Sequence, residues 1–205
     1  MEVYFICNNL FENNLGYTNR HDIEQKKMTR PLSIEGENVA KNIAILDDLS
    51  DTMDIYSSMY ACCLSSAKYL AERLDKITIV DEDLNDCKVG NLGNKSLKMV
   101  KFMQNHDFSV KLNGGESLEE VGDRVQRVMR KILDSGSEKI VIYTHKRTLL
   151  GYLIKNANTG YNLDDDLIVE FNEKVIYNEA DKDADIVKIT YGRDHSILDM
   201  DVIDL

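Results

Sequence analysis

Strand-like and helix-like segments alternate along this chain, and their order is the feature that most constrains its fold. The segments "EVYFI" at 2–6 and "KIVIY" at 139–143 are almost continuously apolar, as expected for strands covered on both faces. Two more strand patterns, "MDIYSS" at 53–58 and "KITIV" at 76–80, flank a helical pattern. We therefore predict an α/β fold, a three-layer α/β/α domain over residues 1–205 with a mostly parallel central sheet.

The helices between these strands carry their own start signals. Pro31 opens a helical pattern for which Ser33 is the expected N-cap. In "GGESLEEVGDRVQRVMRKIL", Ser117 and Glu120 match a capping box and precede an apolar stripe. Further helical patterns lie at 64–74, 96–103 and 147–154, residues 8–30 are expected to form a long polar loop, and two late strand patterns lie at 167–177 and 185–191.

Charge and cysteine usage exclude several classes of protein. The 36 acidic residues outnumber the 25 basic ones for a net charge of -11, which repels nucleic acid and anionic membranes. No apolar run approaches the roughly 20 residues that cross a bilayer, and the first residues lack a signal-peptide pattern, so we expect a cytoplasmic protein. Its four cysteines have no spacing typical of disulfide frameworks and are expected to be buried, reduced thiols.

The polar residues that follow the strands indicate where a site would lie. Asn8, the 57–63 segment, Asp86 and His145 each fall just past a predicted strand or in the adjoining loop. In mostly parallel sheets, ligands bind beyond the carboxyl ends of the strands. We therefore predict that these residues converge on one pocket.

Five segments resemble, in order, landmarks of the histidine phosphatase superfamily, the phosphoglycerate mutase-like fold. "RPLSIEGENVA" is similar to its Pro-Leu-Ser/Thr helix start, and "IYSSMYACCLSSA" to its Ser-Ser segment. "LNDCKVGNLGN" resembles its Leu-x-Glu loop, "GGESLEEV" its Gly-Gly-Glu-Ser helix start, and "VIYTH" the strand before its second catalytic histidine. The resemblance implies that fold over nearly the whole chain.

The resemblance also implies that much of the phosphate-handling chemistry is missing. Members end their first strand with Arg-His-Gly, whose histidine attacks phosphorus; aligned on "EVYFI", those positions are Cys7, Asn8 and Asn9. The nitrogen of a carboxamide has no basic lone pair, so Asn8 cannot form a phosphohistidine-like intermediate. The second phosphate-binding arginine corresponds to Cys62, the proton-donating glutamate to Asp86, and the second histidine to His145. Lys146 stands in place of a glycine, and Asn14 is a further phosphate-site equivalent.

This pattern predicts a degenerate member, a pseudoenzyme with a binding, regulatory or assembly role, without a cofactor. The alternatives are an active phosphatase or phosphomutase acting on a small phosphorylated metabolite, and a repurposed thiol or metal pocket formed by Cys7, Cys62 and His145. The expected partner is a protein or a small anionic ligand, and a homodimer is allowed. Basic residues between the first strand and the first helix form either a solvated face or a cap that attracts an anion: Arg20, His21, Lys26, Lys27 and Arg30.

Overall fold

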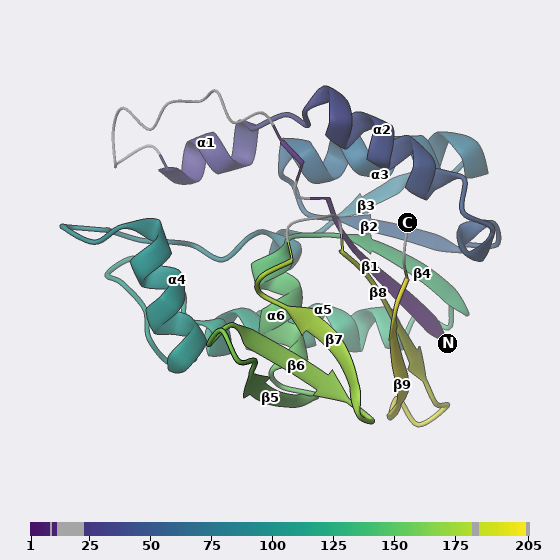
Figure 1. The fold of residues 1–205 in the computed structure, drawn as a ribbon. Coiled ribbons are helices and arrows are strands. Elements are labelled where there is room, and N and C mark those ends of the chain that lie inside the picture. Colours follow the sequence, from purple (N-terminus) through teal and green to yellow (C-terminus); the bar gives the residue numbers. More distant parts are fainter. Residues whose placement is uncertain (9, 12–22, 182–184, 204–205) are drawn as a thin grey trace.

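A six-stranded sheet with the order β3-β2-β4-β1-β8-β9 forms the centre of the molecule (Figure 1). The computed structural model describes residues 1–8, 10–11, 23–181 and 185–203. The first four strands of this order run parallel, whereas β8 and β9 are antiparallel to their neighbours. The strands are β1 Glu2–Cys7, β2 Asp54–Ser57, β3 Thr78–Val80, β4 Lys139–Tyr143, β8 Asp185–Tyr191 and β9 Ile197–Val202.

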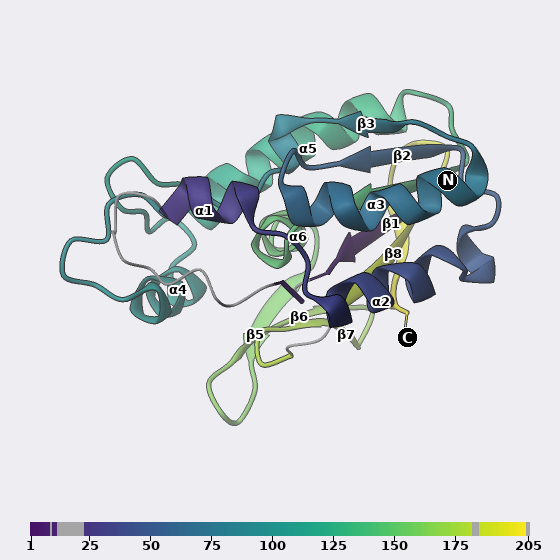
Figure 2. The ribbon, with the colours of Figure 1, turned by 90° about the horizontal axis from the view of Figure 1, so that it is seen from above.

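Helices cover both faces of this sheet, as the alternating sequence pattern predicts (Figures 1 and 2). α2 (Ile34–Ala44) and α3 (Ala61–Leu74) lie on one face and bury a cluster that includes Tyr4 and Ile6 of β1. α5 (Leu118–Leu133) and α6 (Lys146–Leu153) lie on the other, against Val3, Phe5 and Cys7. Successive residues of β1 thus serve opposite cores, which confirms the three-layer α/β/α fold with a mostly parallel sheet.

A separate three-stranded antiparallel sheet packs beside α5 and α6, and no sequence pattern predicted it. It consists of β5 (Asn158–Tyr161), β6 (Leu167–Phe171) and β7 (Lys174–Asn178). The segment 167–177, interpreted as one strand pattern, is a hairpin that reverses at Asn172 and Glu173, both at positive φ. Such a two-residue turn is usually marked by glycine, and its absence hid the reversal.

The expected loop between β1 and α2 contains a helix, α1 (Ile23–Thr29), so that prediction was wrong for this part of the segment. Seven residues are too few for a helix to be stable alone. Tertiary contacts supply the stability: Ile23 packs against Leu92 and Val100, and the Glu24 carboxylate accepts a hydrogen bond from the Val89 amide at 2.6 Å. α1 and α4 (Leu97–His106) stand at the end of the molecule beyond the carboxyl ends of the parallel strands (Figure 2).

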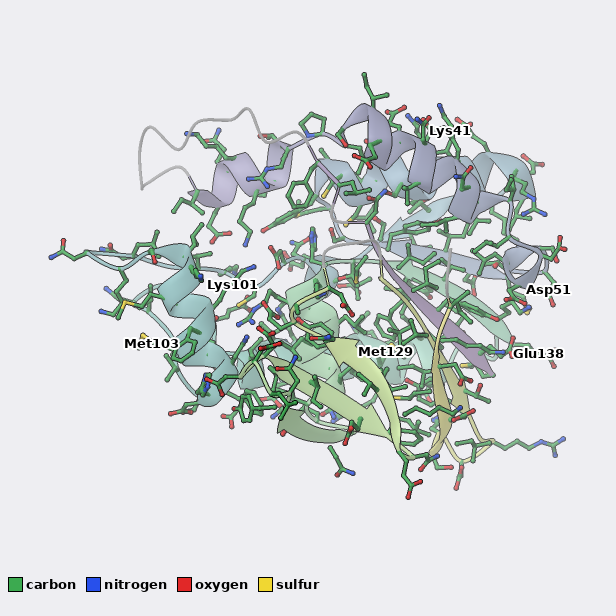
Figure 3. All side chains as sticks on the ribbon, in the orientation of Figure 1. Lys41, Asp51, Lys101, Met103, Met129 and Glu138 are labelled. Atoms are coloured by element: carbon green, nitrogen blue, oxygen red, sulfur yellow. The ribbon has the colours of Figure 1, made fainter. Side chains whose placement is uncertain are left out.

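Both helix caps that the sequence predicts are present in the structure. The Ser33 side chain accepts a hydrogen bond from the Gly36 amide, and both hydrogen bonds of the Ser117–Glu120 capping box are present. Two 3-10 helices, Asp47–Leu49 (η2) and Glu82–Leu84 (η3), complete the described elements. Figure 3 places Lys41, Asp51 and Glu138 at the periphery and Met129 inside the α5 layer. None of the helices in the described ranges has the length and apolar character that crossing a membrane requires.

Candidate functional site

Three neighbouring parallel strands end at the same edge of the central sheet. Asn8 follows β1, Ser58 follows β2, and Thr144 and His145 follow β4. The register pairs Tyr143 with both Ile6 and Ser57, so the residues beyond these positions lie side by side. The loop after η3 brings Asp86 to the same place, because the Leu84 carbonyl accepts a hydrogen bond from the Thr144 hydroxyl at 2.7 Å. The sheet edge therefore brings Tyr60, Cys62, Asp86 and His145 to one cavity, whereas Asn8, which was also expected there, is not among the described residues that line it.

His145 is the buried centre of this site and is the N-cap residue of α6. Its Nε2 lies 2.9 Å from the Ser58 hydroxyl, and the Tyr60 ring meets it edge-on with centroids 4.7 Å apart. Burial, opposed by the Asp86 carboxylate and reinforced by the Lys27 ammonium, lowers the pKa of His145 to about 4. The imidazole is therefore neutral near pH 7, able to accept or share a proton but not a standing cation.

Asp86 is held as a carboxylate by Lys27 of α1. The Asp86 Oδ2 atom lies 2.8 Å from the Lys27 ammonium, and Oδ1 accepts a hydrogen bond from the Cys87 amide at 2.9 Å. Burial alone would raise the pKa of Asp86, but attraction to Lys27 holds that pKa well below its usual range. An ionised carboxylate at neutral pH accepts protons and does not donate them. Lys27 was expected only as part of a basic loop, and nothing in the sequence assigns it this partner.

Asn8 and Cys7 do not face the cavity that the other residues form. The Asn8 amide donates to the Gly36 carbonyl at 2.8 Å and to the Ser66 hydroxyl at 3.3 Å, while its Oδ1 accepts from the Leu10 amide. These bonds tie β1 to α2 and α3. Cys7 is fully buried in the core on the α5 side. Of the described residues, those lining the cavity include Cys62, Asp86 and His145 but neither Cys7 nor Asn8.

Two adjacent thiols of α3 lie against His145. The Cys63 thiol donates to the Thr144 carbonyl at 3.3 Å and lies 3.5 Å from His145 Nε2. Side-chain hydrogen bonding between the two thiols lowers the pKa of Cys62, whereas burial raises the pKa of Cys63 well above its usual value. Within the described part of the chain, the group of possible metal ligands is Cys62, Cys63 and His145. The structure thus replaces Cys7 by Cys63 in the set expected from the sequence, since Cys7 belongs to the opposite core.

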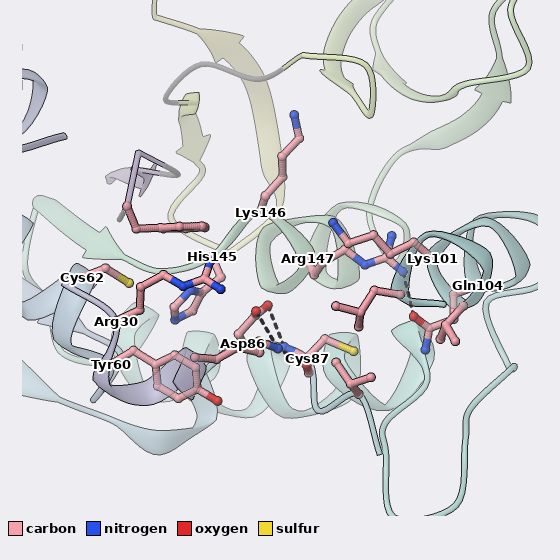
Figure 4. A pocket seen from close by; sticks show the side chains of 15 residues that line it. Arg30, Tyr60, Cys62, Asp86, Cys87, Lys101, Gln104, His145, Lys146 and Arg147 are labelled. Carbon is pink, nitrogen blue, oxygen red and sulfur yellow. Dashed lines mark hydrogen bonds and ion pairs between the residues drawn. The ribbon is translucent and has the colours of Figure 1, made fainter. Parts of the chain in front are cut away.

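A cavity of about 260 Å³ opens over this site (Figure 4). That volume is slightly below the roughly 300–1,000 Å³ typical of small-molecule sites, so the cavity suits a small ligand. In Figure 4, the Cys62 sulfur points toward the His145 ring, and Arg30 lies beside them. Five cationic side chains and, among the described residues, one carboxylate line the cavity: Lys27, Arg30, Lys101, Lys146, Arg147 and Asp86. The cavity is thus locally positive in a chain of net charge -11.

The cations reach the cavity from different elements and are held in different ways. Arg30 stacks on Phe11 with 4.4 Å between its guanidinium carbon and the ring centroid. Lys146 donates to the carbonyl oxygens of Asn178 at 3.0 Å and Asp181 at 2.6 Å. Arg147 donates to two α4 side chains, Asn105 and Gln104. The sequence left open whether Lys146 and Arg147 face solvent; the structure places both at the cavity, Arg147 only 7% exposed.

Some residues named from the sequence lie outside the described residues. Asn14, the further phosphate-site equivalent, is one of them, together with Asn9, Arg20 and His21. Other lining residues had no sequence signal as site residues. Gln104 of α4 and Phe11 come from segments without a strand-end position, and the strand-end rule finds only residues that directly follow strands.

A family model describing the histidine phosphatase superfamily (branch 1) matches residues 16–167. That match spans most of the chain, and the chain belongs to this superfamily. The matched segment contains Cys62, Asp86 and His145 and begins after Cys7 and Asn8. No match to a curated protein reaches significance.

Solved structures share the fold at low sequence identity. A mycobacterial glucosyl-3-phosphoglycerate phosphatase in complex with inorganic phosphate is 14% identical, with a TM-score of 0.71 over 99% of this chain and 95% of that one. Its native form gives 15% identity and a TM-score of 0.69 over 98% and 96%. YhfR of Bacillus stearothermophilus is 16% identical, with a TM-score of 0.62 over 96% and 93%. At such identities these likenesses establish the fold.

Proposed function

We propose that this chain is a pseudoenzyme of the histidine phosphatase superfamily that binds a small phosphorylated or similarly anionic molecule without hydrolysing it. The observation that carries the proposal is the chemistry and the hydrogen bonding of the Asn8 side chain. Its carboxamide stands where the family's nucleophile is expected, has no basic lone pair, and is engaged with Gly36 and Ser66 outside the cavity lining. A side chain in this position cannot take up a phosphoryl group.

Loss of the phosphate clamps supports the same conclusion. Cys7 and Cys62 stand at the positions that the resemblance assigns to two arginines, and neither thiol provides a bidentate cationic donor. Removing one preorganised oxyanion donor typically costs about 100- to 1,000-fold in rate, and here the two clamps and the nucleophile are lost together. Asp86, already ionised and paired with Lys27, is a poor proton donor for a leaving group.

Binding of an anion is supported by the cations that remain around the cavity. Arg30 and Lys146 line it from opposite segments of the chain, and α4 contributes Lys101. The phosphatase among the structural neighbours is named for a small phosphorylated substrate, which suggests the same class of ligand here. Lys27 is paired with Asp86 and the Lys146 ammonium donates to the carbonyl oxygens of Asn178 and Asp181, so we assign the electrostatic attraction mainly to Arg30 and Lys101.

Hydrolysis of an aryl phosphate and a panel of phosphosugars tests the loss of catalysis. We expect the wild-type protein and its His145→Ala variant to hydrolyse these substrates at the same background rate, because neither has a working nucleophile. We also expect no acid-labile phosphoprotein after incubation with labelled substrate. Turnover that His145→Ala abolishes would reject the proposal and favour the alternative, an active phosphatase or phosphomutase that works without a nucleophile at position 8.

Calorimetric titration with phosphorylated metabolites tests the binding half of the proposal. Arg30→Gln is expected to weaken binding about tenfold or more, since it removes a charged donor from the cavity lining. Lys131→Gln is the matched control, because Lys131 is an exposed cation of α5 outside the cavity lining. Absence of heat with every ligand at millimolar concentration would remove the binding role.

A further inference from the structure

Two thiols and an imidazole meet at the wall of the cavity, with the Arg30 side chain beside them (Figure 4). The Sγ atoms of Cys62 and Cys63 and a ring nitrogen of His145 all lie within 4.8 Å of one another. We propose that these three side chains bind a zinc ion, or another thiophilic divalent cation of the same size, with a fourth position open to the cavity. Two thiolates and one imidazole, with an open position, are a ligand set that zinc accepts.

The spacing of the donor atoms agrees with tetrahedral coordination. With typical bonds of about 2.3 Å to sulfur and about 2.0–2.1 Å to nitrogen, a sulfur and a nitrogen on one tetrahedron lie about 3.5 Å apart. Cys63 Sγ lies 3.5 Å from His145 Nε2 and 4.0 Å from Nδ1, so the distance to Nε2 fits, but the sulfur lies beside the ring and the imidazole would have to turn to share an ion with it. Two thiolates on the same tetrahedron lie about 3.8 Å apart. Within the 4.8 Å limit of the group, Cys62 Sγ would have to move by up to about 1 Å toward Cys63 Sγ and up to about 1.3 Å toward the His145 nitrogen.

The hydrogen bonds around the cluster leave the required lone pair available. The Tyr60 amide donates to the Ser58 hydroxyl oxygen at 3.2 Å, so the hydroxyl hydrogen is free to point at His145 Nε2, 2.9 Å away. In that arrangement Nε2 carries no hydrogen and its lone pair is directed at the Ser58 hydroxyl. Zinc would replace the Ser58 hydroxyl as the partner of Nε2. Each thiol would release its proton to solvent, and Cys63 would give up its hydrogen bond to the Thr144 carbonyl.

Access to the cluster comes from the cavity. Cys62 and His145 both line it, whereas Cys63 is not among the lining residues. Figure 4 shows the Cys62 sulfur directed into this space. An ion could enter past Cys62 and keep a water molecule on the cavity side. Cys87 also lines the cavity and is equally buried, but its sulfur lies near the carbonyl oxygens of Lys88 and Glu116, outside the cluster.

Cobalt(II) titration of reduced, tag-free protein tests the site directly. Cobalt bound tetrahedrally by thiolates gives intense visible d–d bands, together with a near-ultraviolet charge-transfer band that scales with the number of cobalt–sulfur bonds. We expect the protein to bind one equivalent of cobalt, with a charge-transfer band as intense as two cobalt–sulfur bonds give. One equivalent of zinc should displace the cobalt and remove the bands. Octahedral spectra, or no band at stoichiometric cobalt, would overturn the proposal without any variant.

Cysteine variants then assign the ligands. Cys62→Ser and Cys63→Ser should each lower the charge-transfer intensity by about half and weaken zinc binding at least tenfold. Cys87→Ser, the matched control, should leave both unchanged. Zinc should also raise the unfolding midpoint of the wild type and of Cys87→Ser more than that of the other two variants, since a ligand of the native state stabilises it. Equal spectra for Cys63→Ser and wild type would reject the assignment. The readouts use the metal alone, so failure of the proposed anion binding would not affect them.

Discussion

At the scale of single residues, the Lys27–Asp86 ion pair holds together the floor of the cavity. The two side chains are 17% and 18% exposed, and the ammonium also donates to the Cys87 carbonyl at 2.8 Å. A buried ion pair stabilises a fold little more than apolar residues of similar volume would at the same positions. Removing one partner, however, leaves the other charge buried without compensation. The pair therefore ties α1 to the loop after η3. Replacing only one of the two residues is expected to lower the free energy of unfolding substantially.

Lys27→Met is expected to lower the free energy of unfolding by about 3 kcal/mol near pH 7, because Asp86 is left charged and unpaired. The double variant Lys27→Met/Asp86→Asn should recover part of this loss, since the buried charge is then gone. Urea unfolding of the three proteins measures the difference. Lys68→Met, which removes an exposed cation 3.7 Å from Glu37, is the control and should cost less than about 1 kcal/mol. Equal losses in the single and double variants would contradict this account.

The same pair sets a pH dependence whose sign follows from Asp86. Its pKa in the folded protein lies below the value of about 3.9 expected when unfolded. Its contribution to stability is therefore fully present above about pH 4 and is lost as the pH falls further. The wild type should lose stability more steeply than the double variant in that acidic window.

The ends of the predicted strands located the site residues along the chain, but they did not predict the direction in which each side chain points. The end of β1 placed Asn8 at the right edge of the sheet, but alternation along the strand sends Cys7 into one core and Asn8 toward α2 and α3. Cys63 was missed as a neighbour of His145, because adjacent helical residues point in different directions and only the packing of α3 brings both thiols to the ring. Strand-end position thus identifies a neighbourhood and not the direction of a side chain.

At the scale of elements, α6 is positioned by a close crossing with α5. A Cβ atom on Gly122 would lie 2.3 Å from the Gly151 carbonyl oxygen, and one on Gly151 would lie 2.7 Å from a Val121 methyl group. Such distances leave no room for a methyl group without a shift of the helices. Since His145 directly precedes α6, this contact also fixes the position of the imidazole.

Gly151→Ala is expected to destabilise the fold by about 2 kcal/mol, because overpacking outweighs the gain in helix propensity of about 1 kcal/mol. Thermal or urea unfolding measures the change. Gly160→Ala is the matched control: its new Cβ would make an ordinary contact at 3.8 Å with Ile168 on the small sheet. A Gly151→Ala protein at least as stable as the wild type would show that the helices separate at little cost.

The elements that the sequence predicted are those stabilised by local signals. Caps at Ser33 and Ser117 and the apolar strands were visible because adjacent residues determine them. α1 and the small sheet were not, because α1 depends on contacts with distant residues and the β6–β7 turn uses Asn172 and Glu173 without glycine. Elements held by tertiary contacts leave a weak trace in sequence.

At the scale of the whole molecule, charge is distributed unevenly. The chain carries a net charge of -11, yet cations dominate one cavity at the carboxyl ends of the parallel strands. Residues far apart in sequence, from Lys27 to Arg147, contribute to it, so no linear pattern marks the site. Self-repulsion of the acidic surface destabilises the compact state, whereas the cavity offers a specific place for an anion.

These two effects can be separated by comparing salts. Sodium chloride should raise the unfolding midpoint modestly, because it screens repulsion over a Debye length of about 10 Å at 0.1 M. Phosphate at matched ionic strength should raise it further, both by general exclusion from the protein surface and by binding in the cavity. Arg30→Gln should keep the chloride and exclusion effects and lose only the increment due to binding, while Lys131→Gln should respond like the wild type. An equal phosphate response in Arg30→Gln would assign the entire increment to exclusion and leave the cavity without a role in anion binding.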